Sequence, residues 1–300
     1  MVDCEYFKKL EHVARQVRNN EKPFGGIQLI ICGDFFQLPP VVSKQKEKER
    51  RFAFETSSWQ RCGLTNIELT QVKRQSDQSL IEILNRLRRG RCSDEDAEVL
   101  TATRDNAVSK NGIVPTKLCT HTDDVNIINT RELEKCSGET KRFVAFQFCI
   151  RRLISNDCRF VASDSDAKLQ NFIDNQTPVD RVITLKEGAQ VMLLKNTNVA
   201  AGLVNGARGR VEKFSPDGNP VVRFLSGNTL EVKSEKWIVK GGAGVTLTRS
   251  QIPLKLAWAF SIHKSQGMTL DCVEVSLSRV FECGQAYVAL SRAKSISSLR

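Results

Sequence analysis

The sequence predicts an α/β protein that also contains a small all-β module. Three observations support this prediction: an apolar run at residues 27–32, a series of short alternating segments between about 183 and 245, and a return to α/β character after Pro253. The length of 300 residues corresponds to about two domains. Because 40% of the residues are hydrophobic and 26% are charged, a sizeable core can form.

The N-terminal part of the chain is predicted to combine helices with one strand. A helix is expected from Asp3, a plausible N-cap, to about Arg18, because apolar residues recur there at helical spacing. The apolar run 27–32 is expected to form a strand that is buried on both faces of a parallel sheet. Two further helices are expected, one after Asp77 and a shorter one after Ser93.

The β module is predicted from its turns. Glycine-containing turn sequences at 205–206, 216–218 and 226–227 separate runs in which apolar and polar residues alternate. The runs are 190–194, 210–212, 221–224 and 230–232. This pattern is typical of tight hairpins and predicts a small β-barrel. Closer to the C-terminus, a strand at 256–262 and a helix at 284–293 are expected.

The net charge indicates a polyanionic partner. The chain carries 45 Lys and Arg against 34 Asp and Glu, a surplus of 11, and residues 201–300 hold 14 against 7. Such a surplus favours nucleic acid, although a solvated basic face or an anionic membrane surface gives the same count. No apolar run reaches the roughly 18 residues that a membrane helix needs, and the N-terminus lacks a secretory layout. We therefore expect an intracellular protein without a membrane partner.

Metal ligands are not grouped in the sequence. The ten cysteines are spread from Cys4 to Cys283 without a C-x-x-C pair, and the three histidines are scattered as well. This spacing supports neither a zinc site nor an iron–sulfur site, so no metal ligand is predicted. The thiols are expected to be reduced.

The segment GDFFQLPP, residues 33–40, is the first candidate for chemistry. It follows the predicted strand, and ligands bind at the carboxyl ends of strands in open α/β sheets. The carboxylate of Asp34 and the carboxamide of Gln37, on a loop stiffened by proline, could orient a water molecule or a metal-bound phosphate. An ordinary exit from a strand is the alternative interpretation.

Three further segments carry clustered polar side chains. They are TQVKRQ with Arg74, SIHKSQG with His263, Lys264, Ser265, Gln266 and Gly267, and GQAYVALSR with Arg292. Arg74 and Arg292 are each placed just beyond a structured element and could neutralise charge that develops on a transferred phosphoryl group. Each arginine taken alone is also compatible with a surface ion pair.

Together, the four segments resemble, almost residue for residue, motifs of the petite-integration-frequency (Pif-type) branch of superfamily-one DNA helicases. GDFFQLPP is similar to the third helicase motif of that family, TQVKRQ to the fourth, SIHKSQG to the fifth and GQAYVALSR to the sixth. Residues 11–30 resemble the signature that this branch carries between its second and third motifs. The order and approximate spacing are kept along the whole chain.

The resemblance implies two RecA-like domains with ATP between them and single-stranded DNA across their top. The implied boundaries are 1–66 for an incomplete first domain, 67–182 and 251–300 for the second, and 183–250 for the inserted β-barrel. Asp34, Gln37, Arg74, Gly267 and Arg292 would face the nucleotide. Gln37 would contact the γ-phosphate or the attacking water, and the two arginines would act as arginine fingers. His263, Lys264, Ser265 and Gln266 would couple DNA contacts to this cleft.

The resemblance also implies ATP and Mg²⁺ as cofactors, but the sequence contains no G-x-x-x-x-G-K-[ST] loop. In the family, the magnesium-binding Asp-Glu pair lies before the position of Val2. We therefore expect a C-terminal helicase portion that does not bind ATP productively or hydrolyse it alone. Asp34 as a substitute magnesium ligand is disfavoured, since the lysine and glycine loop would still be missing. Residues 1–66 are expected to be poorly self-supporting, and 67–300 to be compact.

The leading hypothesis is an ATP-dependent 5′–3′ DNA helicase of DNA repair, recombination and telomere maintenance. It would act on single-stranded DNA and DNA junctions, without an obligate protein partner, in the nucleus or the mitochondrion. The alternative is a non-catalytic protein that binds single-stranded nucleic acid. A β-barrel interaction module with degenerate flanks is a third hypothesis, which the intact flanking motifs disfavour.

Overall fold

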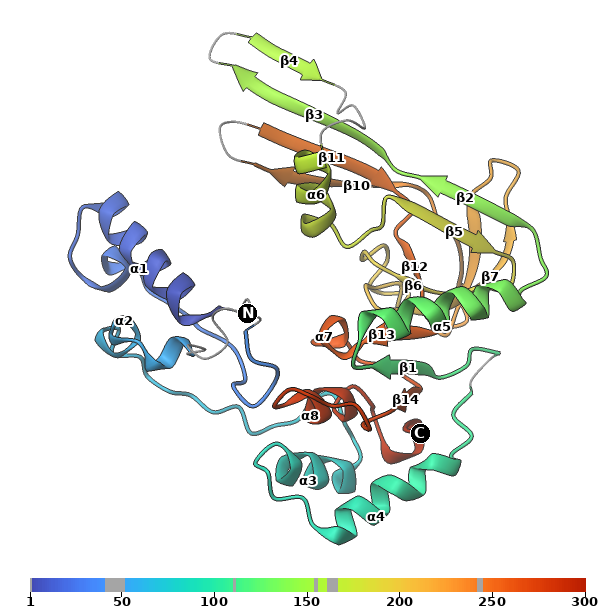
Figure 1. Ribbon diagram of the computed structural model, residues 1–300, viewed down its shortest axis with the longest axis horizontal. Coiled ribbons are helices and arrows are strands. Elements are labelled where there is room, and N and C mark those ends of the chain that lie inside the picture. Colours follow the sequence, from blue (N-terminus) through green and yellow to red (C-terminus); the bar gives the residue numbers. More distant parts are fainter. Residues whose placement is uncertain (1, 41–51, 110–111, 154–155, 161–166, 242–244) are drawn as a thin grey trace.

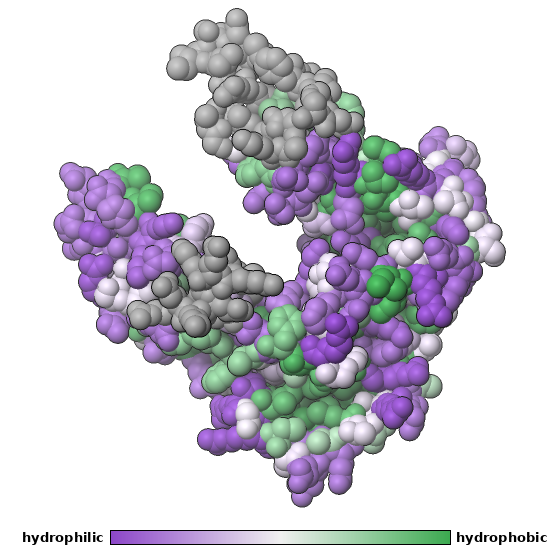
Figure 2. All heavy atoms as spheres, in the orientation of Figure 1, coloured by the Kyte–Doolittle hydropathy of each residue, from purple (hydrophilic) through white to green (hydrophobic). Residues whose placement is uncertain are grey.

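The protein consists of an N-terminal arm, a central parallel sheet with its helices, and a larger antiparallel region (Figure 1). The computed structural model describes residues 2–40, 52–109, 112–153, 156–160, 167–241 and 245–300. An open hollow separates the arm from the antiparallel region in the space-filling view (Figure 2). Among the described residues, no helix has the length and apolar character needed to cross a membrane.

The N-terminal arm is built from short helices around an aromatic core. They are α1 (Cys4–Arg18), α2 (Ser57–Arg61) and the 3-10 helices Pro23–Gly26 and Ala53–Glu55. The side chain of Asp3 caps α1 by accepting a hydrogen bond from the backbone N–H of Tyr6 at 2.7 Å, which confirms the predicted start of this helix. Phe7 packs against Phe24, with ring centroids 5.3 Å apart, and against Trp59.

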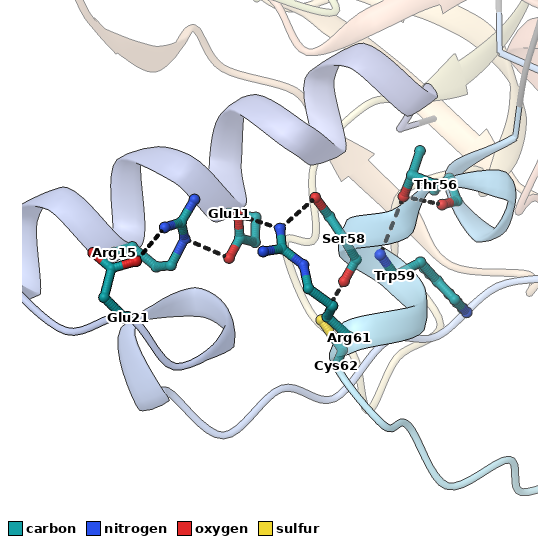
Figure 3. Close-up of polar contacts among 9 residues, drawn as sticks. Glu11, Arg15, Glu21, Thr56, Ser58, Trp59, Arg61 and Cys62 are labelled. Atoms are coloured by element: carbon teal, nitrogen blue, oxygen red, sulfur yellow. Dashed lines mark hydrogen bonds and ion pairs between the residues drawn. The ribbon is translucent and has the colours of Figure 1, made fainter.

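A buried carboxylate joins the two helices of the arm (Figure 3). Glu11 is 2% exposed and accepts a hydrogen bond from Nε of Arg15 at 2.8 Å. Arg61 of α2 lies 3.7 Å from the same carboxylate and also donates to Ser58. A buried charge is tolerated only where it is paired, so this ion pair network fixes α1 against α2.

The predicted strand at 27–32 is wrong: the structure assigns no strand to these residues. Ile30 is 87% exposed, and Ile27 and Ile31 are exposed as well. A continuous apolar run forms a parallel strand only where neighbouring strands accept its hydrogen bonds and helices cover both faces. None of the described strands lies beside this run, so its composition alone does not produce a strand.

The central sheet has three parallel strands in the order β13-β1-β14. They are β1 (Thr116–Cys119), β13 (Ala259–Ser261) and β14 (Val273–Val275). Leu118 is paired with Phe260 on one side and with Val275 on the other. Helix α5 (Thr122–Lys135) is fixed to this sheet by Asn129, which bonds both the N–H and the C=O of Ala259 at 3.0 and 3.1 Å.

The helices near the central sheet share its core. They are α3 (Gln78–Leu87), α4 (Asp94–Ala102), α7 (Ile262–Ser265), α8 (Gln285–Leu290) and the 3-10 helices Thr103–Asp105 and Ile296–Ser298. The caps Asp77 of α3 and Ser93 of α4 are confirmed, and each accepts a backbone hydrogen bond at 3.2 Å. Helix α8 is shorter than the predicted 284–293. Leu38 of the arm reaches the same core and connects the arm to the central sheet.

The β module is an open sheet of five strands in the order β12-β6-β7-β8-β9. The strands are β6 (Gln190–Leu193), β7 (Arg208–Phe214), β8 (Pro220–Phe224), β9 (Thr229–Glu231) and β12 (Leu254–Leu256). The predicted hairpins are confirmed, and Gly206, Gly218 and Gly227 have the positive φ that their turns need. The predicted barrel is not found: no closed barrel forms among the described strands, because β12 and β9 are edges.

A second antiparallel sheet, in the order β10-β11-β3-β4, was not anticipated from the sequence. Its strands are β3 (Phe146–Leu153), β4 (Asn156–Phe160), β10 (Glu235–Lys240) and β11 (Val245–Gln251). A separate pair joins β2 (Thr140–Val144) and β5 (Val182–Lys186). Helix α6 (Ala167–Gln176) is linked to β11 by the ion pair of Asp174 with buried Arg249. Strands from 183–250 therefore pair with strands that precede that range.

Candidate nucleotide and nucleic-acid site

The loop 33–40 lies against the beginning of α8. Gly284, the N-cap of α8, has a φ of +76°, and a Cβ at this position would lie 2.6 Å from the carbonyl oxygens of both Phe36 and Gln37. Only glycine combines this backbone conformation with so close an approach. The first residue of the GQAYVALSR segment therefore brings the GDFFQLPP loop into contact with the helix that leads to Arg292.

Asp34 holds this loop in shape. Its carboxylate accepts hydrogen bonds from Nη2 of Arg88 at 2.7 Å, from the N–H of Phe36 at 3.1 Å and from Nε2 of Gln37 at 3.4 Å. The carboxylate is therefore already hydrogen-bonded to other groups of the protein. No group of three or more His, Cys, Asp or Glu side chains suited to a metal ion occurs within the described ranges.

Arg88 belongs to this candidate site although it was not predicted from the sequence. It caps the C-terminus of α3, and its guanidinium lies over the rings of Phe36 at 4.9 Å and Tyr287 at 5.6 Å. It therefore contacts both the loop of Asp34 and helix α8. No local signal distinguishes it, because it is one of several arginines at the end of a helix, where cations are common.

Gln37 and Gln266 are brought together from positions 229 residues apart. Nε2 of Gln266 donates to Oε1 of Gln37 at 3.1 Å. Gln266 directly follows α7, which extends from the carboxyl end of β13. This bond links the loop 33–40 to the SIHKSQG segment.

Arg74 and Arg292 flank the same turn from two sides. Nε of Arg74 donates to the hydroxyl of Thr269 at 3.0 Å, and its Nη2 lies 3.4 Å from the carbonyl oxygen of Gly267. Arg292 donates to the carbonyl oxygen of Met268 at 3.2 Å. Neither guanidinium has a carboxylate partner among the described residues. Two adjacent cations without a counter-ion form a suitable place for an anion.

Arg292 is the more deeply buried of the two arginines. It is 1% exposed and also donates to the carbonyl oxygen of Val288 at 2.8 Å and to the hydroxyl of Ser291 at 2.7 Å. Burial, followed by the nearby charge of Arg74, lowers the pKa of Arg292 to about 10. The side chain is still a cation at neutral pH, and an incoming anion would relieve its desolvation.

The side chains of α7 differ in their exposure to solvent. Lys264 is exposed, and its pKa is lowered mainly by the charge of Lys255, with burial adding to the effect. His263 faces the ring of Phe281. Ser265 is fully buried, and its hydroxyl donates to the carbonyl oxygen of Ile262 at 2.8 Å. The structure therefore offers Lys264 and His263 to a ligand but not Ser265.

Replacing Arg88 by alanine is expected to loosen the loop 33–40. The variant loses the charged hydrogen bond to Asp34 and the contacts with two rings, for a destabilisation of about 1–3 kcal/mol. Urea unfolding measures this change, and limited proteolysis reports cleavage within the loop. The matched control is the exposed Arg89→Ala, which should have little effect. Equal behaviour of the two variants would show that Arg88 does not hold the loop.

The sequence matches known proteins along its whole length. Residues 1–98 match the family model described as PIF1-like helicase, and residues 168–214 match the DNA helicase Pif1 2B domain. The ATP-dependent DNA helicase PIF1 of Xenopus laevis is 52% identical over 303 residues, which cover 100% of this chain and 45% of the relative. The chain thus spans less than half the length of that relative.

Solved structures show the same mixed α/β fold. A Pif1 helicase from Candida albicans is 36% identical with a TM-score of 0.79, and the match covers 100% of this chain and 70% of that one. A Bacteroides Pif1 helicase in complex with ADP-AlF3 and single-stranded DNA is 28% identical with a TM-score of 0.65, over 100% and 67% of the two chains. The four motifs, their spatial arrangement and these similarities place the chain in the Pif1-like family of DNA helicases.

Proposed function

We propose that this chain is the motor portion of an ATP-dependent DNA helicase that moves 5′ to 3′ along single-stranded DNA. The observation that carries the proposal is the pair Arg74 and Arg292, two cations without a carboxylate partner among the described residues, next to the turn that begins at Gly267. The relatives named above are helicases, and one of them binds single-stranded DNA and a nucleotide analogue.

On the nucleotide side, the residues of this chain would act by charge and position. Arg74 and Arg292 would neutralise charge on the transferred phosphoryl group, and Gln37 would orient the attacking water or the γ-phosphate. Asp34 would keep the loop of Gln37 in place. Gly267, whose carbonyl oxygen meets Arg74, would shape the edge of this pocket.

The residues present fit a phosphoryl group but not its magnesium ion. The carboxylate of Asp34 is already bound by Arg88, and the described residues offer no clustered carboxylates. Magnesium neutralises the phosphates when it is bound in this class of enzyme. Productive ATP binding therefore requires a phosphate loop and magnesium ligands besides the residues of this sequence. This observation favours the second candidate for the 300 residues alone, a non-catalytic protein that binds single-stranded nucleic acid.

On the DNA side, Lys264 and His263 would contact the single-stranded DNA at the carboxyl edge of the central sheet. Gln266 would link these two residues to Gln37. The basic surplus of residues 201–300 would add affinity that does not depend on base sequence.

We extend the proposal to DNA junctions, to roles in repair, recombination and telomere maintenance, and to the nucleus or mitochondrion. Residues 1–66 would belong to the first RecA-like domain. Residues 67–182 and 251–300 would form the second domain, with the β module 183–250 inserted between these two parts.

Replacing Lys264 by alanine tests the proposed DNA contact. Fluorescence anisotropy with a labelled oligo(dT) should show binding by the 300-residue chain. The logarithm of its binding constant should fall linearly with the logarithm of the salt concentration. The variant should bind less tightly, and its salt slope should fall by about 1, because one phosphate contact is lost. The control is Lys213→Ala, an exposed lysine of β7. No binding by the unmodified chain at low salt would contradict the proposal.

A further inference from the structure

Three rings meet at the carboxyl edge of the central sheet. His121 follows β1, His263 follows β13, and Phe281 lies in the segment between β14 and α8. The ring centroid of Phe281 is 5.2 Å from that of His121 and 6.4 Å from that of His263. The planes of Phe281 and His263 differ by only 23°. Residues separated by up to 160 positions thus form one aromatic cluster, which we call the His-Phe-His cluster.

The segment of Phe281 is held in place from both sides. Nη1 of Arg279 donates to the carboxylate of Asp124, in the first turn of α5, at 3.1 Å. The N–H of Phe281 donates to Oε1 of Gln285 at 3.1 Å, and Gln285 is fully buried. The position of the ring therefore follows from α5 on one side and α8 on the other.

His121 is also oriented by a neighbour. Its Nδ1 lies 2.8 Å from the hydroxyl of Thr120, which is buried. This bond uses one ring nitrogen and fixes the plane of the imidazole. The cluster is therefore organised before any ligand arrives, which lowers the entropy cost of binding.

Phe281 does not serve as a core residue. It is 61% exposed although it contacts two rings, and the exposed Lys264 directly follows His263 in α7. Proteins bind single-stranded nucleic acid with exposed aromatic rings that stack on the bases and with cations that meet the phosphates.

We propose that Phe281, supported by His121 and His263, stacks on a nucleobase of single-stranded DNA. The inference rests on the proposed function and adds to it a base contact in addition to the phosphate contact of Lys264. Every base has a π-face, so the contact contributes affinity without sequence preference. Because Phe281 is bonded to Gln285 of α8, the stacked base adjoins the helix that leads to Arg292.

The test compares Phe281→Ala with the unmodified 300-residue chain, using labelled oligo(dT) and an oligonucleotide of equal length that carries abasic sites. The variant should bind oligo(dT) about five-fold or more weakly, with an unchanged salt slope, because a stacking contact and not a phosphate contact is lost. The unmodified chain should discriminate against the abasic strand, whereas the variant should bind both strands alike. Phe281→Trp should restore binding and discrimination.

The matched control is Phe146→Ala, since Phe146 is also 61% exposed but lies on β3. Circular dichroism melts should show that all variants are folded. If Phe281→Ala binds oligo(dT) as tightly as the unmodified chain, or keeps its discrimination against the abasic strand, the stacking contact is overturned while the proposed function stands. If the unmodified chain binds no oligo(dT) at all, the proposed function itself fails.

Discussion

Replacing Gly284 by alanine is expected to displace the loop 33–40 from α8. The added Cβ would lie 2.6 Å from two backbone carbonyl oxygens, of Phe36 and Gln37, and the φ of +76° is unfavourable for alanine. Backbone strain and overpacking together predict a destabilisation of about 2–5 kcal/mol. Urea unfolding measures the loss, and limited proteolysis should show earlier cleavage in the loop.

Gly227→Ala separates the two causes of this effect. Gly227 has a φ of +88°, and a Cβ there would meet no atom within 4 Å. Its replacement therefore carries only the conformational cost, about 1–2 kcal/mol. If both alanine variants lose the same stability and retain the same protease pattern, the close approach of the loop to Gly284 is not important for the fold.

Replacing Arg292 by methionine is expected to abolish ATP hydrolysis while leaving the fold nearly intact. An arginine that neutralises the transferred phosphoryl group contributes about 10³-fold or more to the rate. Its hydrogen bonds to Val288 and Met268 are lost in the variant, but a desolvated cation is removed as well. The free energy of unfolding should therefore change by less than about 2 kcal/mol.

Hydrolysis is assayed in a form of the protein that also carries a phosphate-binding loop, and stability is measured in the 300-residue chain. Arg292→Lys keeps the charge but loses the planar fork, so it should restore only part of the rate. The exposed Arg91→Met is the control for the loss of one positive charge. A methionine variant that hydrolyses ATP at the normal rate would remove Arg292 from the proposed chemistry.

Local signals in the sequence were sufficient for the helices α1, α3 and α4 and for the hairpins of the β module, but not for α5 or α6. Asp3 and Asp77 are caps that fix where α1 and α3 begin, and glycines such as Gly206 fix the turns between strands. These features depend on a few neighbouring residues. The strand predicted at 27–32 was wrong because a strand, unlike a helix cap or a turn, depends on neighbouring strands that its own sequence does not contain.

The features that were not predicted depend on contacts between segments that are distant in sequence. The sheet β10-β11-β3-β4 joins two strands at the end of the predicted barrel range, 183–250, to two strands that precede this range, and no local pattern indicates that pairing. At the candidate site, the motif resemblance indicated Gln37 and Gln266, but Arg88 and Phe281 are placed there by contacts with segments distant in sequence. Such residues become visible only once the fold brings the segments together.

Hydrogen–deuterium exchange of the 300-residue chain, with and without saturating oligo(dT), tests most directly whether the carboxyl edge of the central sheet binds DNA. Slower exchange is predicted in residues 119–122, 261–267 and 277–283, which follow β1, β13 and β14. Protection confined to the five-stranded sheet, or no protection under conditions where the oligonucleotide is bound, would contradict this account.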